Sequence, residues 1–259
     1  MSQNPPSKPS HKYRLLLAYD GAPFRGFARQ PDLPTVQGKL ESVLSRVLRE
    51  EIRTSAAGRT DAGVHALGQV VSFATSTPLE DPTDLRRRCN AMLGPAIAVL
   101  EVAPVAEAFD ARFSCLSRTY EYAIVNREVH DPFSRHTAWH HPGPLDVASM
   151  RKASQALAGE HDFSSFGRVS EGQNPVRRVE SIELEQEGQL LVIRVTANSF
   201  IQQMVRSIVG TLVKVGEGRE DPGRMGEILR AADRARAGLV APAHGLFLVS
   251  ASYPPEIPQ

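Results

Sequence analysis

Segment 57–66 combines small residues with an arginine and a carboxylate in a pattern that could support catalysis. It reads Ala-Gly-Arg-Thr-Asp-Ala-Gly-Val-His-Ala and is expected to form a loop between two strands. Gly58 and Gly63 permit unusual backbone angles and the close approach of another chain. Arg59 could neutralise Asp61 or hold a phosphate, and loops on a rigid scaffold often carry catalytic groups. The same residues would also suit a structural turn with a solvated ion pair.

Other familiar catalytic patterns do not occur in the sequence. The segment lacks the Gly-Lys-Ser/Thr ending of a phosphate-binding P-loop, so nucleoside triphosphate binding is not expected. The histidines, including His65, show no regular metal-ligand spacing, so we expect no metal site. No Gly-x-Ser-x-Gly motif or Cys/His pair indicates a serine or cysteine nucleophile. Cys89 and Cys115 are expected to be free thiols in a reducing compartment.

The composition is that of a globular protein with an unusual preference for arginine over lysine. Hydrophobic residues make up 41% of the chain and charged residues 23%, and the formal net charge is +1. This balance excludes a uniformly basic surface but permits a basic groove. Arginine binds phosphate at two points through its planar guanidinium, although a codon preference for arginine explains the composition equally well. We expect no membrane span and no signal peptide, and hence a cytoplasmic location.

Hydrophobic periodicity predicts the elements that must position these groups. The clearest is an amphipathic helix that begins at Pro34 and Thr35, with apolar residues at helical spacing on one face. The rest of the first half is expected to contain one further helix at 84–93, a loop at 58–68, and strands at 13–19, 52–57, 69–75 and 97–102.

The second half is expected to repeat a similar order of elements. Gly159 is expected to cap a helix, and Glu187-Gly188 to form a hairpin turn. The expected elements are helices at 146–158, at 201–213 and from Asp221, and strands at 119–125, 182–186, 190–197 and 246–250.

This order of elements predicts an α+β fold in which helices cover a mixed, mainly antiparallel sheet. We assign residues 1–12 to a flexible tail and residues 13–110 to an N-terminal half that carries the candidate loop. Residues 111–253 form the C-terminal half, and residues 254–259 a second tail.

Segment 57–66 resembles the Gly-Arg-Thr-Asp-Ala-Gly-Val-His signature of the TruA family of tRNA pseudouridine synthases. The resemblance covers nearly the whole folded chain, because further family motifs follow in order. It departs from the family at Phe27-Ala28, where a tryptophan and a polar residue are frequent, and at Gln202-Gln203, where histidines can occur. The further motifs are Tyr19-Asp20-Gly21 with Gly26 and Gln30, Asp110-Ala111-Arg112-Phe113-Ser114, Arg118-Thr119-Tyr120-Glu121-Tyr122, Asn198-Ser199-Phe200, Met204-Val205-Arg206-Ser207-Ile208-Val209-Gly210, and Ala241 with Gly245-Leu246-Phe247-Leu248.

The resemblance implies an isomerase that converts uridine in RNA to pseudouridine without metal or cofactor. Such an enzyme breaks the glycosidic bond, rotates the base and rejoins it to the sugar through carbon five. Asp61 would be the essential carboxylate, acting either by direct attack on the sugar or by proton removal in a glycal route. Both routes remain open. The target nucleotide must leave its stack, which suits a stem-loop substrate.

The resemblance also implies roles for residues around Asp61. Arg59 would keep Asp61 ionised, and Tyr120 would stack on the uracil. Arg206 lies beside the apolar face of its helix and needs an anionic partner, for which Asp61 is one possibility. Leu246 would pack against the base, although Tyr120 and Leu246 could equally be core residues. Candidate phosphate ligands, each of which could instead be solvated surface, are Arg25, Arg29, Arg86, Arg87, Arg88, Arg168, Arg177 and Arg178.

The resemblance finally implies an architecture, partners and a substrate. Two similar α/β halves would share one sheet with a central cleft, and two subunits of a homodimer would hold tRNA. The targets would be uridines 38, 39 and 40 of the anticodon stem-loop. One alternative is an RNA-binding protein without activity, which would need neither Asp61 nor Tyr120. Another is a carboxylate glycosidase, which normally needs a second positioned acid, and the signature loop contains none.

Overall fold

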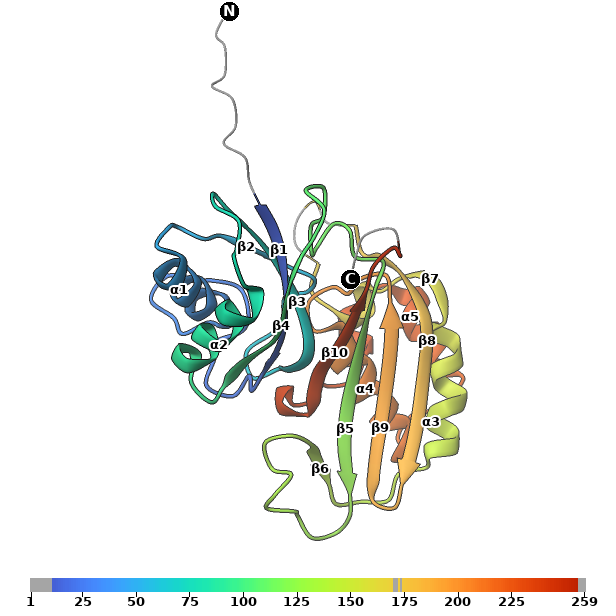
Figure 1. Cartoon of the computed structure of the whole chain (residues 1–259). Coiled ribbons are helices and arrows are strands. Elements are labelled where there is room, and N and C mark those ends of the chain that lie inside the picture. Colours follow the sequence, from blue (N-terminus) through green and yellow to red (C-terminus); the bar gives the residue numbers. More distant parts are fainter. Residues whose placement is uncertain (1–10, 170–171, 173, 256–259) are drawn as a thin grey trace, which may run out of the picture.

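The computed structural model describes residues 11–169, 172 and 174–255. Within these residues the chain forms a ten-stranded sheet with helices packed on it (Figure 1). The strand order is β4-β1-β3-β10-β5-β9-β8-β7, with β2 paired to β3 and β6 paired to β5. The β10/β3 and β5/β6 pairs are parallel, and the other pairs in the described residues are antiparallel. The prediction of an α+β fold with a mixed, mainly antiparallel sheet is therefore confirmed.

The strands are β1 (His11–Tyr19), β2 (Thr54–Ala56), β3 (His65–Thr75), β4 (Ile97–Pro104), β5 (Ser117–Asn126), β6 (Trp139–His141), β7 (Gly159–Asp162), β8 (Val176–Glu187), β9 (Leu190–Ala197) and β10 (Leu246–Ser252). The α-helices are α1 (Val36–Leu48), α2 (Pro82–Leu93), α3 (Val147–Ser154), α4 (Met204–Gly216) and α5 (Arg224–Ala231).

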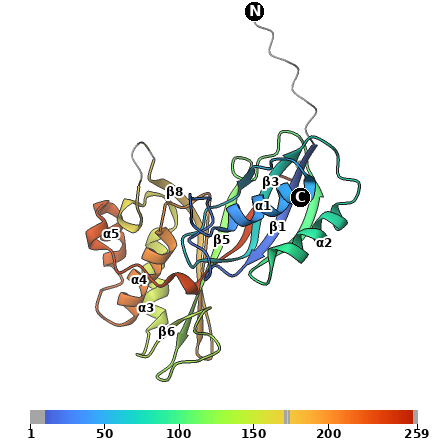
Figure 2. The ribbon, with the colours of Figure 1, turned by 90° about the vertical axis from the view of Figure 1, so that its left-hand side faces the viewer.

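The last strand of the chain lies at the centre of the sheet. β10 pairs in parallel with β3 on one side and antiparallel with β5 on the other. It therefore joins the strands of the first half to those of the second. Figure 2 shows the helices in two separate groups, with α1 and α2 near β1 and β3, and α3, α4 and α5 near β5 and β8.

The core lies between one face of this sheet and the helices. Side chains alternate between buried and half-exposed along β1, β5 and β9, as the period of two in a strand requires. The buried row of β5 contains Tyr120, Tyr122 and Ile124. The opposite face is polar in part, since Arg194 on β9 pairs with Glu121 on β5 at 2.7 Å.

The predicted start of α1 is confirmed and has a local cause. Thr35 is the N-cap, and its hydroxyl accepts a hydrogen bond from the backbone N–H of Gly38 at 3.2 Å. This bond satisfies one of the helix's unpaired N–H groups. The predicted hairpin is also confirmed, although its turn lies at Gly188 and Gln189, one residue further on than expected.

Two expected boundaries near the candidate loop are wrong. β1 begins at His11, so His11 and Lys12 belong to the strand and not to a tail. β3 begins at His65, and the loop expected at 58–68 ends at residue 64. The earlier start of β3 is caused by a strand that is distant in sequence, because β10 pairs with His65 and Ala66 and extends β3.

The second half also differs from expectation in its details. Gly159 does not cap a helix: α3 ends at Ser154, a 3-10 turn follows, and Gly159 opens β7. α4 begins at Met204 because Gln203 adopts a left-handed conformation with φ of 66°. α5 begins at Arg224, after the expected Asp221. The short strands β6 and β7 were not expected.

Within the described residues, every helix is too short or too polar to cross a membrane.

Candidate active site

The loop that carries Asp61 connects β2 to β3, and a buried glutamine holds its start. The side-chain amide of Gln69 donates to the Gly58 carbonyl at 2.7 Å, and its oxygen accepts from the Gly58 N–H at 3.3 Å. The hydroxyl groups of Thr60 and Tyr19 lie 2.8 Å apart. These bonds tie the loop to β3 and β1. Burial raises the pKa of Tyr19 to about 12, so this phenol stays neutral.

The glycines before α1 support the same loop by allowing close approach. A Cβ atom on Gly21 would lie 2.0 Å from the Val64 carbonyl oxygen, so no larger residue fits there. Gly26 has φ of 103° and lies against the Thr60 carbonyl, which also accepts a hydrogen bond from the N–H of Phe27 at 3.0 Å. The first motif of the chain is therefore part of the support of the Asp61 loop.

Asp61 is partly buried and pairs with an arginine from α4. Its carboxylate oxygen lies 3.5 Å from Nη1 of Arg206, and the two side chains are 21% and 15% exposed. The Nε of Arg206 donates to the Ala241 carbonyl at 2.7 Å, and the Ala241 N–H donates back to the Arg206 carbonyl at 3.1 Å. These bonds direct the guanidinium towards Asp61, so the possible Arg206–Asp61 pair is confirmed.

Arg59 does not take the position expected for it. Its side chain is exposed, and it forms no ion pair within the part of the chain that the structure describes. The neighbouring Thr60 is anchored to Tyr19 in the interior, which leaves Arg59 on the solvent side of the loop. The cation beside Asp61 is therefore Arg206, from the other half of the chain.

Tyr120 lies on β5, close to the start of the Asp61 loop. It is 7% exposed, and a Cβ atom on Gly58 would lie 3.3 Å from its hydroxyl. Phe200 packs edge-on against its ring at a centroid distance of 5.0 Å. Burial raises the pKa of Tyr120 well above its ordinary value, and the nearby Tyr19 and Asp61 act in the same direction. Tyr120 is therefore a neutral phenol.

Leu246 is buried at the start of β10, where it is paired with Tyr122. Two residues further, Leu248 pairs with Tyr120, and a Cβ atom on Gly58 would lie 3.8 Å from its side chain. Sequence reasoning missed the proximity of Leu248 to the loop. The alternation of β10 alone could have identified it, because Leu246 and Leu248 share one face.

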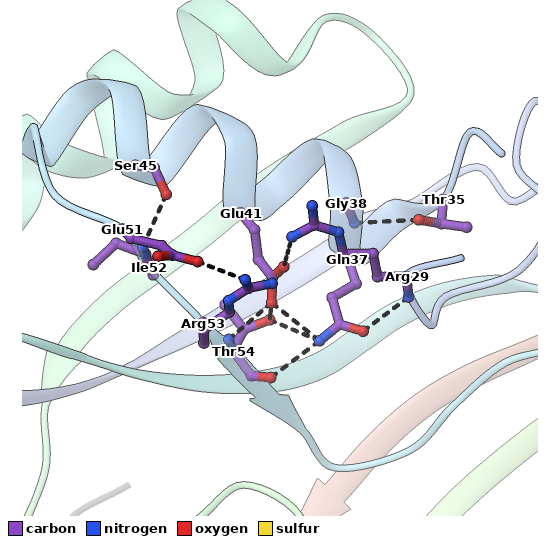
Figure 3. A network of polar contacts seen from close by, with 10 residues as sticks. All are labelled: Arg29, Thr35, Gln37, Gly38, Glu41, Ser45, Glu51, Ile52, Arg53 and Thr54. Atoms are coloured by element: carbon purple, nitrogen blue, oxygen red, sulfur yellow. Dashed lines mark hydrogen bonds and ion pairs between the residues drawn. The ribbon is translucent and has the colours of Figure 1, made fainter. Parts of the chain in front are cut away.

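Two of the candidate phosphate ligands lie in the loop before α1. Arg29 is 57% exposed and pairs with the buried carboxylate of Glu41 at 3.4 Å (Figure 3). Gln37 accepts a hydrogen bond from the Arg29 N–H at 3.0 Å. Arg25 is exposed in the same loop. This loop touches Thr60 through Phe27, so both arginines flank the candidate site on the side of α1.

Three further candidates lie on the side of β8. Arg168 forms a β-bridge with Gln202 in the segment that leads into α4. The backbone N–H of Arg178 donates to the side-chain oxygen of Asn198 at 3.0 Å, and the Asn198 N–H donates to the Arg178 carbonyl at 3.1 Å. Arg178 is 62% exposed. The guanidinium of Arg177 donates to two carbonyl groups, and burial lowers its pKa. Arg86, Arg87 and Arg88 are instead bonded within or beside α2.

The arrangement suits one-carboxylate chemistry. Asp61 offers a partly accessible carboxylate, Arg206 orients it, and Tyr120 adds an aromatic surface and a neutral hydroxyl.

Within the described residues, no group of three or more His, Cys, Asp or Glu side chains could hold a metal ion. Surface hollows occur beside the end of α4 and on the outer face of β1, β3 and β10, and Asp61 lines neither. The central cleft therefore stays a prediction.

Comparisons with known proteins place this chain in a family. Residues 16–114 and 153–254 match the profile of the family described as tRNA pseudouridine synthase. Among the similar proteins is the tRNA pseudouridine synthase A of Thermosipho africanus. This chain is 43% identical to it, and the match covers 92% of this chain and 97% of the relative. The corresponding protein of Azorhizobium caulinodans is 42% identical over 95% and 96%, and that of Frankia casuarinae 44% over 95% and 90%.

The fold and the matches thus define an isomerase that acts on RNA. The chain belongs to the tRNA pseudouridine synthase A family. A solved structure described as an H/ACA RNP bound to a substrate RNA containing 2'-deoxyuridine covers 78% of this chain and 44% of its own, at 14% identity and a TM-score of 0.38. This last similarity is too low to add to the assignment.

Proposed function

We propose that this chain isomerises uridine to pseudouridine in the anticodon stem-loop of tRNA, with Asp61 as the essential carboxylate. The observation that carries the proposal is the position of Asp61. Its loop is tied to β1 and β3, its side chain pairs with Arg206 at 3.5 Å, and Tyr120 lies beside the loop. A fixed carboxylate next to a fixed cation and an aromatic ring is the constellation that the reaction needs.

Two routes are compatible with this arrangement. In the first, Asp61 attacks C1′ of the sugar, the C1′–N1 bond breaks, and the uracil leaves with the bonding electrons. In the second, Asp61 removes the proton from C2′ while the same bond breaks, which gives a glycal. In both routes the base then rotates. In the first route C5 attacks C1′ and displaces the Asp61 carboxylate, and in the second C5 bonds to C1′ while Asp61 returns the proton to C2′. N1 takes up a proton, and the proton on C5 is lost. Arg206 orients the carboxylate, and Tyr120 stacks on the uracil and can carry that proton.

Uridines 38, 39 and 40 are the proposed targets. The relatives are named tRNA pseudouridine synthase A, and exposed arginines lie in the loop before α1 and on β8, where they could hold the RNA backbone. We also propose that two copies of the chain hold one tRNA in the cytoplasm, with the chain divided after residue 110 into the two halves of each subunit. Leu246 and Arg59 would contact the substrate, and no metal or organic cofactor would take part.

Tritium release tests the aspartate directly. Purified wild-type protein is incubated, without added metal or cofactor, with tRNA that carries 5-tritiated uridine. We compare Asp61→Asn with Asp84→Asn, a half-exposed carboxylate on α2 that pairs with Arg87. The wild type and Asp84→Asn should release tritium, whereas Asp61→Asn should bind tRNA without release. Turnover by Asp61→Asn would refute the proposed carboxylate.

The same assay separates the alternatives. Release of free uracil in place of tritium would favour a glycosidase. A folded wild type that binds tRNA without release would favour an inactive RNA-binding protein or a different RNA target. Transcripts in which cytidine replaces the uridines at positions 38, 39 and 40, one at a time, identify the positions that are modified.

A further inference from the structure

We propose that Arg118 is a positioning residue that fixes the Asp61 loop relative to Tyr120. The inference rests on the proposed role of Asp61. Arg118 lies on β5, two residues before Tyr120 and on the same face, and is 8% exposed. This face of β5 otherwise carries Tyr120, Tyr122 and Ile124. A cation therefore occupies a position in the buried row where an apolar side chain would be expected.

The guanidinium of Arg118 bonds to four carbonyl groups, two of which belong to segments distant in sequence. Its Nε donates to the Ala57 carbonyl at 2.9 Å, and Nη2 donates to the Arg112 carbonyl at 2.8 Å. Its Nη1 donates to the carbonyl groups of Asn198 at 2.6 Å and Cys115 at 3.2 Å. Arg118 thus joins the start of the Asp61 loop, the turn before β5 and the segment after β9.

The partners of Arg118 are carbonyl dipoles and not an acid. Within the described residues it forms no ion pair. A buried cation is costly, and an apolar residue of similar volume often stabilises a protein as well or better. Packing alone would therefore not favour arginine here. The planar fork of a guanidinium can instead serve several acceptors in fixed directions, which the single ammonium group of lysine cannot reproduce.

The bonded segments form the surroundings of Tyr120. Ala57 precedes Gly58, against which the Tyr120 hydroxyl lies. Asn198 leads to Phe200, whose ring packs edge-on against Tyr120. Arg118 therefore fixes the loop on one side of Tyr120 and the aromatic neighbour on another. If these bonds were lost, Asp61 and Tyr120 could still be present, but their separation would no longer be fixed.

The test uses Arg118→Lys and Arg118→Gln, with Arg14→Lys as the matched control. Arg14 on β1 has a similarly buried side chain, 11% exposed, and bonds to Glu101 on the outer strand β4. We expect Arg118→Lys to bind tRNA with the affinity of the wild type. Its rate of tritium release in a single turnover should fall about 100-fold, because an error of about 1 Å in the position of reacting groups costs that much. Amide hydrogen exchange should accelerate in segments 57–64 and 198–200 and not in the control.

Three results would overturn the inference. One is a rate for Arg118→Lys that falls no further than that of Arg14→Lys. Another is a loss of tRNA affinity as large as the loss of rate, which would indicate a role in binding. The third is failure of both Arg118 variants to fold, which would indicate a role in stability. Asp61→Asn is assayed in parallel, so turnover by that variant would refute the proposed carboxylate independently of Arg118.

Discussion

At the residue scale, the candidate site depends on an ion pair between residues far apart in sequence. Asp61 lies in the β2–β3 loop, and Arg206 lies on α4. Both side chains are partly buried, so their interaction is screened less than that of an exposed pair. Removal of either group leaves the other without its partner in a partly desolvated position. Arg59, although close to Asp61 in sequence, is exposed.

Arg206→Gln and Arg59→Gln should therefore act on different steps. Loss of Arg206 removes the group that orients the carboxylate, so we expect the single-turnover rate to fall on the order of 100-fold with little change in affinity. Loss of Arg59 removes an exposed cation, so we expect weaker tRNA binding at low salt and a rate closer to that of the wild type. Tritium release and filter binding measure the two quantities. Equal losses of rate in both variants would contradict this assignment.

At the scale of elements, a buried carboxylate on α1 joins three segments (Figure 3). Glu41 accepts hydrogen bonds from the backbone N–H and the hydroxyl of Thr54, at 2.9 and 3.0 Å, and from the amide of Gln37 at 3.2 Å. It also pairs with Arg29. Glu41 thereby fixes β2 and the loop before α1, the two segments that border the Asp61 loop on either side.

Glu41→Gln should destabilise the protein. The bonds from Thr54 and Gln37 all reach Oε1, and Arg29 faces Oε2, so the amide NH2 of glutamine would face the guanidinium of Arg29 in place of a carboxylate oxygen. We expect a loss of about 1–3 kcal/mol in the free energy of unfolding, because the hydrogen bonds of a charged acceptor are stronger than those of a neutral one and one donor is left facing another donor. Urea unfolding measures the loss. Glu50→Gln is the control, because Glu50 accepts from the Ser76 N–H at an exposed position. A loss no larger than that of the control would show that the network contributes little.

At the scale of the whole molecule, exposed arginines lie in both halves of the chain, Arg29 before α1 and Arg178 on β8. Arg29 lies in the loop before α1, where it pairs with Glu41. Arg178 lies on β8 and bonds to Asn198 in the segment before α4. β10 lies between β3 and β5 and so joins the strands of the two halves into one sheet. A substrate that contacted both arginines would span the central strands β3, β10 and β5, next to the β2–β3 loop that carries Asp61.

Arg29→Gln and Arg178→Gln should each reduce the salt dependence of tRNA binding. A phosphate contact that is lost lowers the slope of log K against log salt by about one. Binding titrations over a range of salt concentrations measure that slope. Arg87→Gln is the control, because Arg87 pairs with Asp84 on the surface of α2. An unchanged slope in either test variant would remove that arginine from the proposed interface.

The sequence by itself determined the elements and the loop that matters. Helical spacing after Thr35 located α1, and alternation located β9 and the outer part of β3, because local periodicity records which face of an element is buried. The small residues around Asp61 were enough to mark its loop as a candidate site. The motifs between Tyr19 and Leu248 identified the family, and the comparisons confirmed it.

Only the tertiary structure decided which residues meet at that loop. Arg206 and not the nearby Arg59 pairs with Asp61, β3 is longer than expected because β10 pairs with its start, and Arg118 bonds to carbonyl groups of distant segments. The physical reason is the same in each case. Periodicity in a sequence reports the environment of a residue along its own element, whereas the partner that faces it across the fold is set by how elements pack and pair.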